Sequence, residues 1–156
     1  MAWTTPRDWV TGETVTAALL NAQVRDNIEF LAGEVDGSSS VSTQALTGSF
    51  TNIVTVTLAI PATWGSWKCY ADASFTTRPV AGFETVEIKI RIDGTDASET
   101  QTMAVNNRAS GAINGRRTGM TTTGDRAINL QARDLAVADG AVMNSAFVYA
   151  RAVRLT

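Results

Sequence analysis

The sequence predicts a mainly β protein, with an N-terminal extended arm and a single amphipathic helix followed by an antiparallel jelly-roll β-sandwich. From residue 45 onward, apolar and polar residues alternate in about seven or eight short runs separated by glycine, asparagine or proline. Ahead of them, one stretch alone repeats apolar residues at helical spacing. The chain's 156 residues suffice for one compact domain plus an appendage. We expect arm and helix over 1–33, a linker over 34–44 and the sandwich over 45–156.

The first thirteen residues show little periodicity and predict an extended arm. Two of the four tryptophans of the chain, Trp3 and Trp9, lie in it. Large apolar rings are unusual on a free, solvated terminus, so we expect this arm to be held by a partner. The alternative is that it folds back on its own sandwich. Tryptophan and arginine are common interface anchors, and the candidate anchoring residues are Trp3, Pro6, Arg7 and Trp9.

A helix is expected from about residue 17 to residue 32. Thr16 is a suitable N-cap, and Gly33 is a suitable C-terminal stop. One apolar stripe follows the helical period, with an asparagine near it that could set the register of an oligomeric coil. The stripe must pack either on the sandwich or on copies of itself. The candidate packing residues are Leu20, Val24, Asn27, Ile28 and Leu31. The stretch from Glu34 to Ser40 is rich in glycine, serine and acidic residues and predicts a flexible linker.

Period-two alternation then predicts the strands in order. Asp93-Gly94, Asn114-Gly115 and Gly124-Asp125 are expected turns between them. The expected strands are 54–60, 67–75, 86–92, 100–106, 116–123, 128–132 and 146–155.

The last expected strand is apolar on both faces. Ala146, Val148, Ala150 and Ala152 would share one face, and Phe147, Tyr149 and Val153 the other. A strand that is apolar on both faces is buried on both. The pattern predicts a subunit interface at Phe147, Tyr149 and Val153, although a strand in the middle of a monomer would look the same.

The residue inventory argues against catalysis. Histidine is absent, which removes the commonest general base and every Ser-His or Cys-His pair. Cys69 is the sole cysteine and sits at an apolar position of its strand, so a buried structural thiol is expected. No phosphate-binding loop or nucleophile motif occurs. We expect no enzyme activity, no cofactor and no metal site.

Three further features have a plain and a functional interpretation. Asp93, Asp96 and Glu99 fit an acidic hairpin tip better than a calcium loop. The segment 108–117 fits a solvated hairpin connection better than a loop touching a capsid, a sugar or a partner. Core packing is favoured for Trp67, while Trp64 could equally stack on a sugar ring.

The charge pattern and the apolar runs limit the partners. The net charge is −2 and the basic residues are scattered, so nucleic-acid binding is not expected. No apolar run approaches the roughly 20 residues that cross a bilayer, so no membrane contact is expected. No signal-peptide pattern is present, which predicts synthesis in a host cytoplasm.

Two resemblances add to these expectations. Residues 3 to about 31 resemble a leader of tailed-bacteriophage virion proteins, through W-T-x-P-R-x-W-x-x-G-E, then V-T-A-A-x-L-N and R-D-N. This resemblance implies a virion structural protein that the leader attaches or assembles. Segments 60–65 and 124–133 and the closing strand resemble the small trimeric jelly rolls related to C1q and tumour-necrosis-factor heads. That resemblance implies three-fold symmetry with the closing strand near the axis.

The expected function is therefore that of a non-enzymatic component of a phage virion. It would be a capsid decoration, head-fibre or minor tail protein that binds phage capsid or tail proteins and forms a homotrimer. A receptor- or carbohydrate-binding module at a tail tip, with a host-surface glycan as ligand, is the first alternative. A glycan-degrading enzyme is the second.

Overall fold

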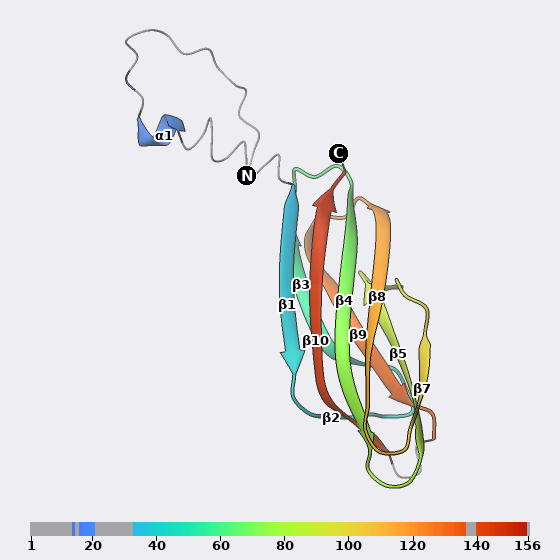
Figure 1. Ribbon diagram of the computed structural model, residues 1–156. Helices are drawn as coiled ribbons and strands as arrows, with labels where there is room; N and C mark the ends of the chain where they lie inside the picture. Colours follow the sequence, from blue (N-terminus) through green and yellow to red (C-terminus); the bar gives the residue numbers. More distant parts are fainter. Residues whose placement is uncertain (1–13, 15, 21–32, 137–139, 156) are drawn as a thin grey trace.

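The computed structural model describes residue 14 and residues 16–20, 33–136 and 140–155. From residue 33 onward these form two antiparallel sheets of five strands each, packed face to face (Figure 1). The predicted mainly β fold with a β-sandwich is therefore confirmed.

The first sheet has the strand order β1-β10-β4-β8, and a short strand, β2, pairs with the beginning of β10. The second has the order β3-β9-β5-β6, and β7 pairs with β5. Strands distant in sequence are thus neighbours, as in a jelly roll. The first sheet comprises β1 (Glu34–Val41), β2 (Gln44–Ala45), β4 (Trp67–Pro79), β8 (Ala109–Met120) and β10 (Ala141–Arg154). The second comprises β3 (Thr51–Ile60), β5 (Glu84–Ile92), β6 (Thr95–Asp96), β7 (Gln101–Val105) and β9 (Gly124–Asp134).

The core lies between the sheets and consists of the inward-facing half of each alternating strand. The pattern is clearest in β5 and β10, where every second residue is buried along most of the strand. Cys69 is fully buried, as predicted, and burial raises the pKa of its thiol to about 12, so the thiol stays protonated and unreactive. The largest fully buried side chains include Leu58, Trp67, Ile88, Ile90, Ile92, Ile128, Leu130, Met143 and Val148.

The predicted turn at Asp93-Gly94 is confirmed. Both residues have positive φ, +50° and +75°, as a tight reversal between β5 and β6 requires. The turn expected at Asn114-Gly115 is wrong, because both residues lie inside β8. A Cβ on Gly115 would come within 3.0 Å of the Ile90 Cγ2 atom in the opposite sheet. This glycine allows a close approach of backbone to side chain and does not mark a bend.

The expected linker over 34–44 is also wrong over most of its length. Glu34 to Val41 form β1, which pairs residue by residue with β10, from Glu34 opposite Val153 to Val41 opposite Ala146. The glycine and the serines suggested a flexible linker, but a small residue is needed at position 37 because it faces the opposite sheet. A Cβ on Gly37 would lie 3.1 Å from the Val56 Cγ1 atom. The sandwich therefore begins at Glu34.

The N-terminal predictions are only partly covered by the described residues. A helix, α1 (Ala17–Leu20), lies within the expected one, and the rest of the expected helix lies outside the described residues. The described part of the chain contains no helix long and apolar enough to cross a membrane. The other candidate residues lie outside the described residues and remain predictions: Trp3, Pro6, Arg7, Trp9, Val24, Asn27, Ile28 and Leu31.

Candidate functional site

The outer face of the first sheet carries large exposed apolar side chains on its central strand. Phe147 is 44% exposed, Tyr149 is 36% exposed and Val153 is half-buried. The other face of β10 is fully in the core. All three predicted interface residues thus lie on one outward face, where no other part of the described chain covers the two aromatic rings. We call this surface the β10 face; its outward residues include Glu34, Asp36, Ser38, Ser40, Tyr70, Asp72, Ser74, Ala112, Asn114, Arg116, Phe147, Tyr149, Arg151 and Val153.

Short side chains surround the two exposed rings. Phe147 lies between Ser40 on β1 and Ser74 on β4, and Tyr149 lies between Ser38 and Asp72. These neighbours leave a depression of about 470 Å³ beside Phe147, which extends to Ser110 and Gly111 at the far edge of the sheet. A flat sheet with one protruding ring beside a hollow can interlock with another surface of complementary shape.

Some of the polar groups of the β10 face have partners within it. The Tyr149 hydroxyl donates a hydrogen bond of 3.2 Å to Asp36. Desolvation and the nearby Asp36 carboxylate raise the pKa of Tyr149, so its phenol stays protonated. The Arg151 guanidinium lies 5.8 Å from the Tyr70 ring centroid and pairs with Glu34 at 3.3 Å. A partner can therefore cover the face without burying these particular charged groups unpaired.

The acidic cluster at the β5–β6 hairpin is held by cations of this chain. Asp93 accepts a hydrogen bond from Thr122 and pairs with Arg126 at 3.4 Å. Asp96 pairs with Lys89 at 2.9 Å and with Arg91 at 3.1 Å. The interpretation as a charged hairpin tip fits this arrangement, and the described residues contain no group of three or more acidic or cysteine side chains suited to a metal.

The two tryptophans considered for sugar binding do not present an accessible platform. Trp64 is 5% exposed and Trp67 is fully buried, with its indole N–H donating to the Thr122 carbonyl at 2.9 Å. Stacking on a sugar ring is therefore excluded for Trp67, whose predicted core position is confirmed, and is precluded by burial for Trp64. The segment 108–117, expected as a hairpin connection, forms most of β8.

Sequence reasoning predicted an interface at Phe147, Tyr149 and Val153, and the structure places all three on the outer face of the sheet, but the neighbours from other strands were not predicted. Tyr70 and Arg116 join the β10 face only because β4 lies between β10 and β8. No local pattern encodes that order. The alternation of β4 did indicate that Tyr70 faces away from Cys69, which is a weak signal that could have placed it on an outer surface.

Comparison with known proteins gives the fold and no family. No protein-family model matches the chain, and no curated protein matches it. Among solved structures, a domain of latent PorU from Porphyromonas gingivalis is similar with a TM-score of 0.51 at 9% identity, over 79% of this chain and 13% of PorU. The C-terminal domain of EclA, a sugar-binding protein, gives a TM-score of 0.44 at 14% identity, covering 72% of this chain and 76% of that one. The globular domain of zebrafish complement 1qA gives 0.37 at 11% identity, covering 80% and 98%. These similarities concern the β-sandwich or jelly-roll fold alone.

Proposed function

We propose that this chain is a non-enzymatic structural protein of a tailed-bacteriophage virion, of the capsid-decoration, head-fibre or minor-tail type. The N-terminal arm attaches it to capsid or tail proteins, and the sandwich projects outward and associates into a homotrimer through the β10 face. The observation that carries the assembly part is the pair of exposed rings, Phe147 and Tyr149, on the central strand of a sheet.

The chemistry of the β10 face favours copies of this chain as its partner. Phenylalanine and tyrosine contribute much buried area for little lost side-chain entropy, and serine neighbours allow close approach. Arg151 already pairs with Glu34, and the Tyr149 hydroxyl already donates to Asp36, so these groups keep their partners when a second copy covers the face. Closed point symmetry is the usual arrangement of identical subunits, and the choice of three copies rests on the resemblance to the trimeric jelly-roll heads.

The solution mass of the full chain tests the trimer directly. Three copies of the 16.6 kDa chain should give about 50 kDa by light scattering. Phe147→Glu should lower the mass to that of a monomer, because a carboxylate would be desolvated in the interface. Thr57→Glu is the matched control, since Thr57 is an exposed position on the outer face of the second sheet.

Circular dichroism should confirm that both variants stay folded. A monomeric unaltered chain, or a Phe147→Glu variant with unchanged mass, would contradict assembly through this face. If the unaltered chain were a monomer, the receptor- or carbohydrate-binding alternative would be favoured.

The arm is tested by replacing both anchors, Trp3→Ala together with Trp9→Ala. We expect the sandwich to fold and the protein to be absent from purified phage particles, because interface tryptophans contribute a large share of binding energy. The measurement is quantitative immunoblotting of particles assembled with each variant. Thr4→Ala with Thr5→Ala is the control within the same segment and should be incorporated normally. Normal incorporation of the double tryptophan variant would remove the anchor proposal.

A further inference from the structure

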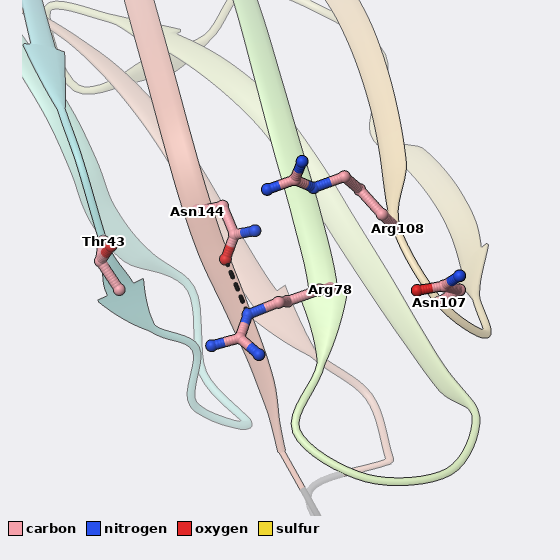
Figure 2. Close-up of a pocket in the computed structure, with 5 residues that line it drawn as sticks. All are labelled: Thr43, Arg78, Asn107, Arg108 and Asn144. Carbon is pink, nitrogen blue, oxygen red and sulfur yellow. Dashed lines mark hydrogen bonds between the residues drawn. The ribbon is translucent and has the colours of Figure 1, made fainter.

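A polar depression of about 720 Å³ lies at the end of the first sheet where β10 begins, next along the strands from the depression beside Phe147. Its lining comes from separate parts of the chain: the end of β4, the beginning of β10, the β7–β8 connection and the bend between β1 and β2 (Figure 2). The volume is in the range of small-molecule sites. The lining residues are Thr43, Arg78, Asn107, Arg108 and Asn144.

Arg78 lies near the end of β4, and Arg108 lies at the same level just before the beginning of β8. Arg108 directly precedes Ala109, and Ala109 pairs with Thr77, the neighbour of Arg78. Figure 2 shows both guanidinium groups extended across the sheet toward β10. Two cationic side chains beside one hollow repel each other, and a bound anion would relieve that repulsion. No carboxylate is among the residues that line the depression.

Several other arginines have an ion-pair partner in this chain, whereas Arg116, which does not line this depression, has none among the described residues. Arg117 and Arg126 pair with Asp93, Arg133 pairs with Glu87, and Arg151 pairs with Glu34. Within the part of the chain that the structure describes, Arg78 and Arg108 have no ion pair. Two guanidinium groups without an ion-pair partner beside one hollow have the chemistry that suits an oxyanion.

A β-bulge places the amide that orients Arg78. Met143 is opposite Thr77 and Ser145 is opposite Thr76, so Asn144 is the extra residue of β10. Its side-chain oxygen accepts a hydrogen bond of 3.0 Å from Arg78 Nε. The terminal nitrogens of Arg78 stay available for a ligand. Bulges commonly redirect a side chain next to functional sites, and here the bulge holds one guanidinium in place.

We propose that this depression binds a sugar or polyol that carries an oxyanion group, either a carboxylate or a phosphate. Arg78 and Arg108 take the oxyanion, while the amide of Asn107 and the hydroxyl of Thr43 offer both donors and acceptors for ligand hydroxyls. The site is separate from the assembly proposal and stands whether or not the chain belongs to a virion. A nucleic-acid track does not fit, because it requires a run of cations along a groove and this site has two.

Calorimetric titration of the full chain with four probes tests the site. Trigalacturonate supplies the carboxylate source, and glycerol 3-phosphate supplies the phosphate source. Maltotriose is the neutral sugar, and inorganic phosphate is the bare anion. We expect one or both of the anionic polyols to bind, with added salt weakening the binding. We expect maltotriose not to bind and inorganic phosphate to bind more weakly than the better polyol.

The variants Arg78→Gln and Arg108→Gln should each weaken that binding about tenfold, which corresponds to the loss of one charge-assisted contact. Arg91→Gln is the matched control, because Arg91 lies on the second sheet, and Asp96 keeps Lys89 as its partner. It should bind as the unaltered chain does.

The better of the two anionic polyols identifies the source of the oxyanion. Binding of neither one, or equal binding by Arg78→Gln and the unaltered chain, would overturn the site. Equal affinity for inorganic phosphate and the better polyol would overturn its selectivity for sugars. None of these outcomes depends on the solution mass, so the result is independent of the trimer.

Discussion

Replacing Trp67 with alanine is expected to lower the free energy of unfolding by about 3–5 kcal/mol, the range observed for the loss of a large buried aromatic side chain. Trp67 is fully buried between the sheets at the beginning of β4. Its removal also leaves the Thr122 carbonyl without the indole donor that now lies 2.9 Å away. Because single domains are stable by only about 5–15 kcal/mol, this one change would remove a large part of the total.

Urea denaturation followed by circular dichroism measures this loss, at one fixed protein concentration because oligomers unfold in a concentration-dependent way. Trp67→Phe keeps most of the ring and loses the N–H, so we expect a smaller loss of about 1–2 kcal/mol. Lys68→Ala is the neighbouring control and should change little, since its side chain faces outward. A loss below about 1 kcal/mol for Trp67→Ala would mean that this region is not part of the cooperative core.

The strands that sequence reasoning placed correctly are those whose alternation is chemically strong. In β5, Val86, Ile88 and Ile90 alternate with charged residues, and period two follows directly from the pleat of a strand. The turn at Asp93-Gly94 was recognisable for the same reason, since its residue types tolerate positive φ. Local chemistry and structure agree at these positions.

The errors share one cause, which is the use of small residues for close packing between sheets. Gly37 and Gly115 each face a branched side chain of the opposite sheet at about 3 Å from a hypothetical Cβ. A glycine that accommodates a distant neighbour looks the same in sequence as a glycine that permits a turn. The predictions of a linker over 34–44 and of a turn at Asn114-Gly115 were wrong for this reason: the contact that explains each glycine comes from a strand far along the chain.

The candidate sites divide in the same way. The outward position of Phe147 and Tyr149 was predictable, because the alternation within one strand shows which of its residues share a face. The depression around Arg78 was not, because its residues meet only through the pairing of β4 with β10 and β8. The Asn144 bulge is equally invisible, since an extra residue in a ladder is defined by the partner strand.

Deleting residues 1–41 is expected to destabilise the sandwich severely, by several kcal/mol and on the order of 10 °C or more in the midpoint of thermal unfolding. This deletion removes β1 and its eight pairings with β10. It also uncovers Val56 and Leu58, which Gly37 now approaches closely, and takes away the apolar contacts of Val35 and Val41 with the core. The edge of β10 left open would be a template for aggregation.

Deleting residues 1–32 is the matched comparison, because it keeps Gly33 and all of β1. We expect this shorter deletion to melt at nearly the temperature of the full chain, with its β-sheet circular dichroism intact. Thermal melts of the three proteins at equal concentration measure the difference. If residues 34–41 were only a linker, the two deletions would melt together, and β1 would contribute nothing to the fold. If they differ as expected, any assay of the isolated sandwich must begin before Glu34, because a start inside β1 would confuse unfolding with loss of assembly.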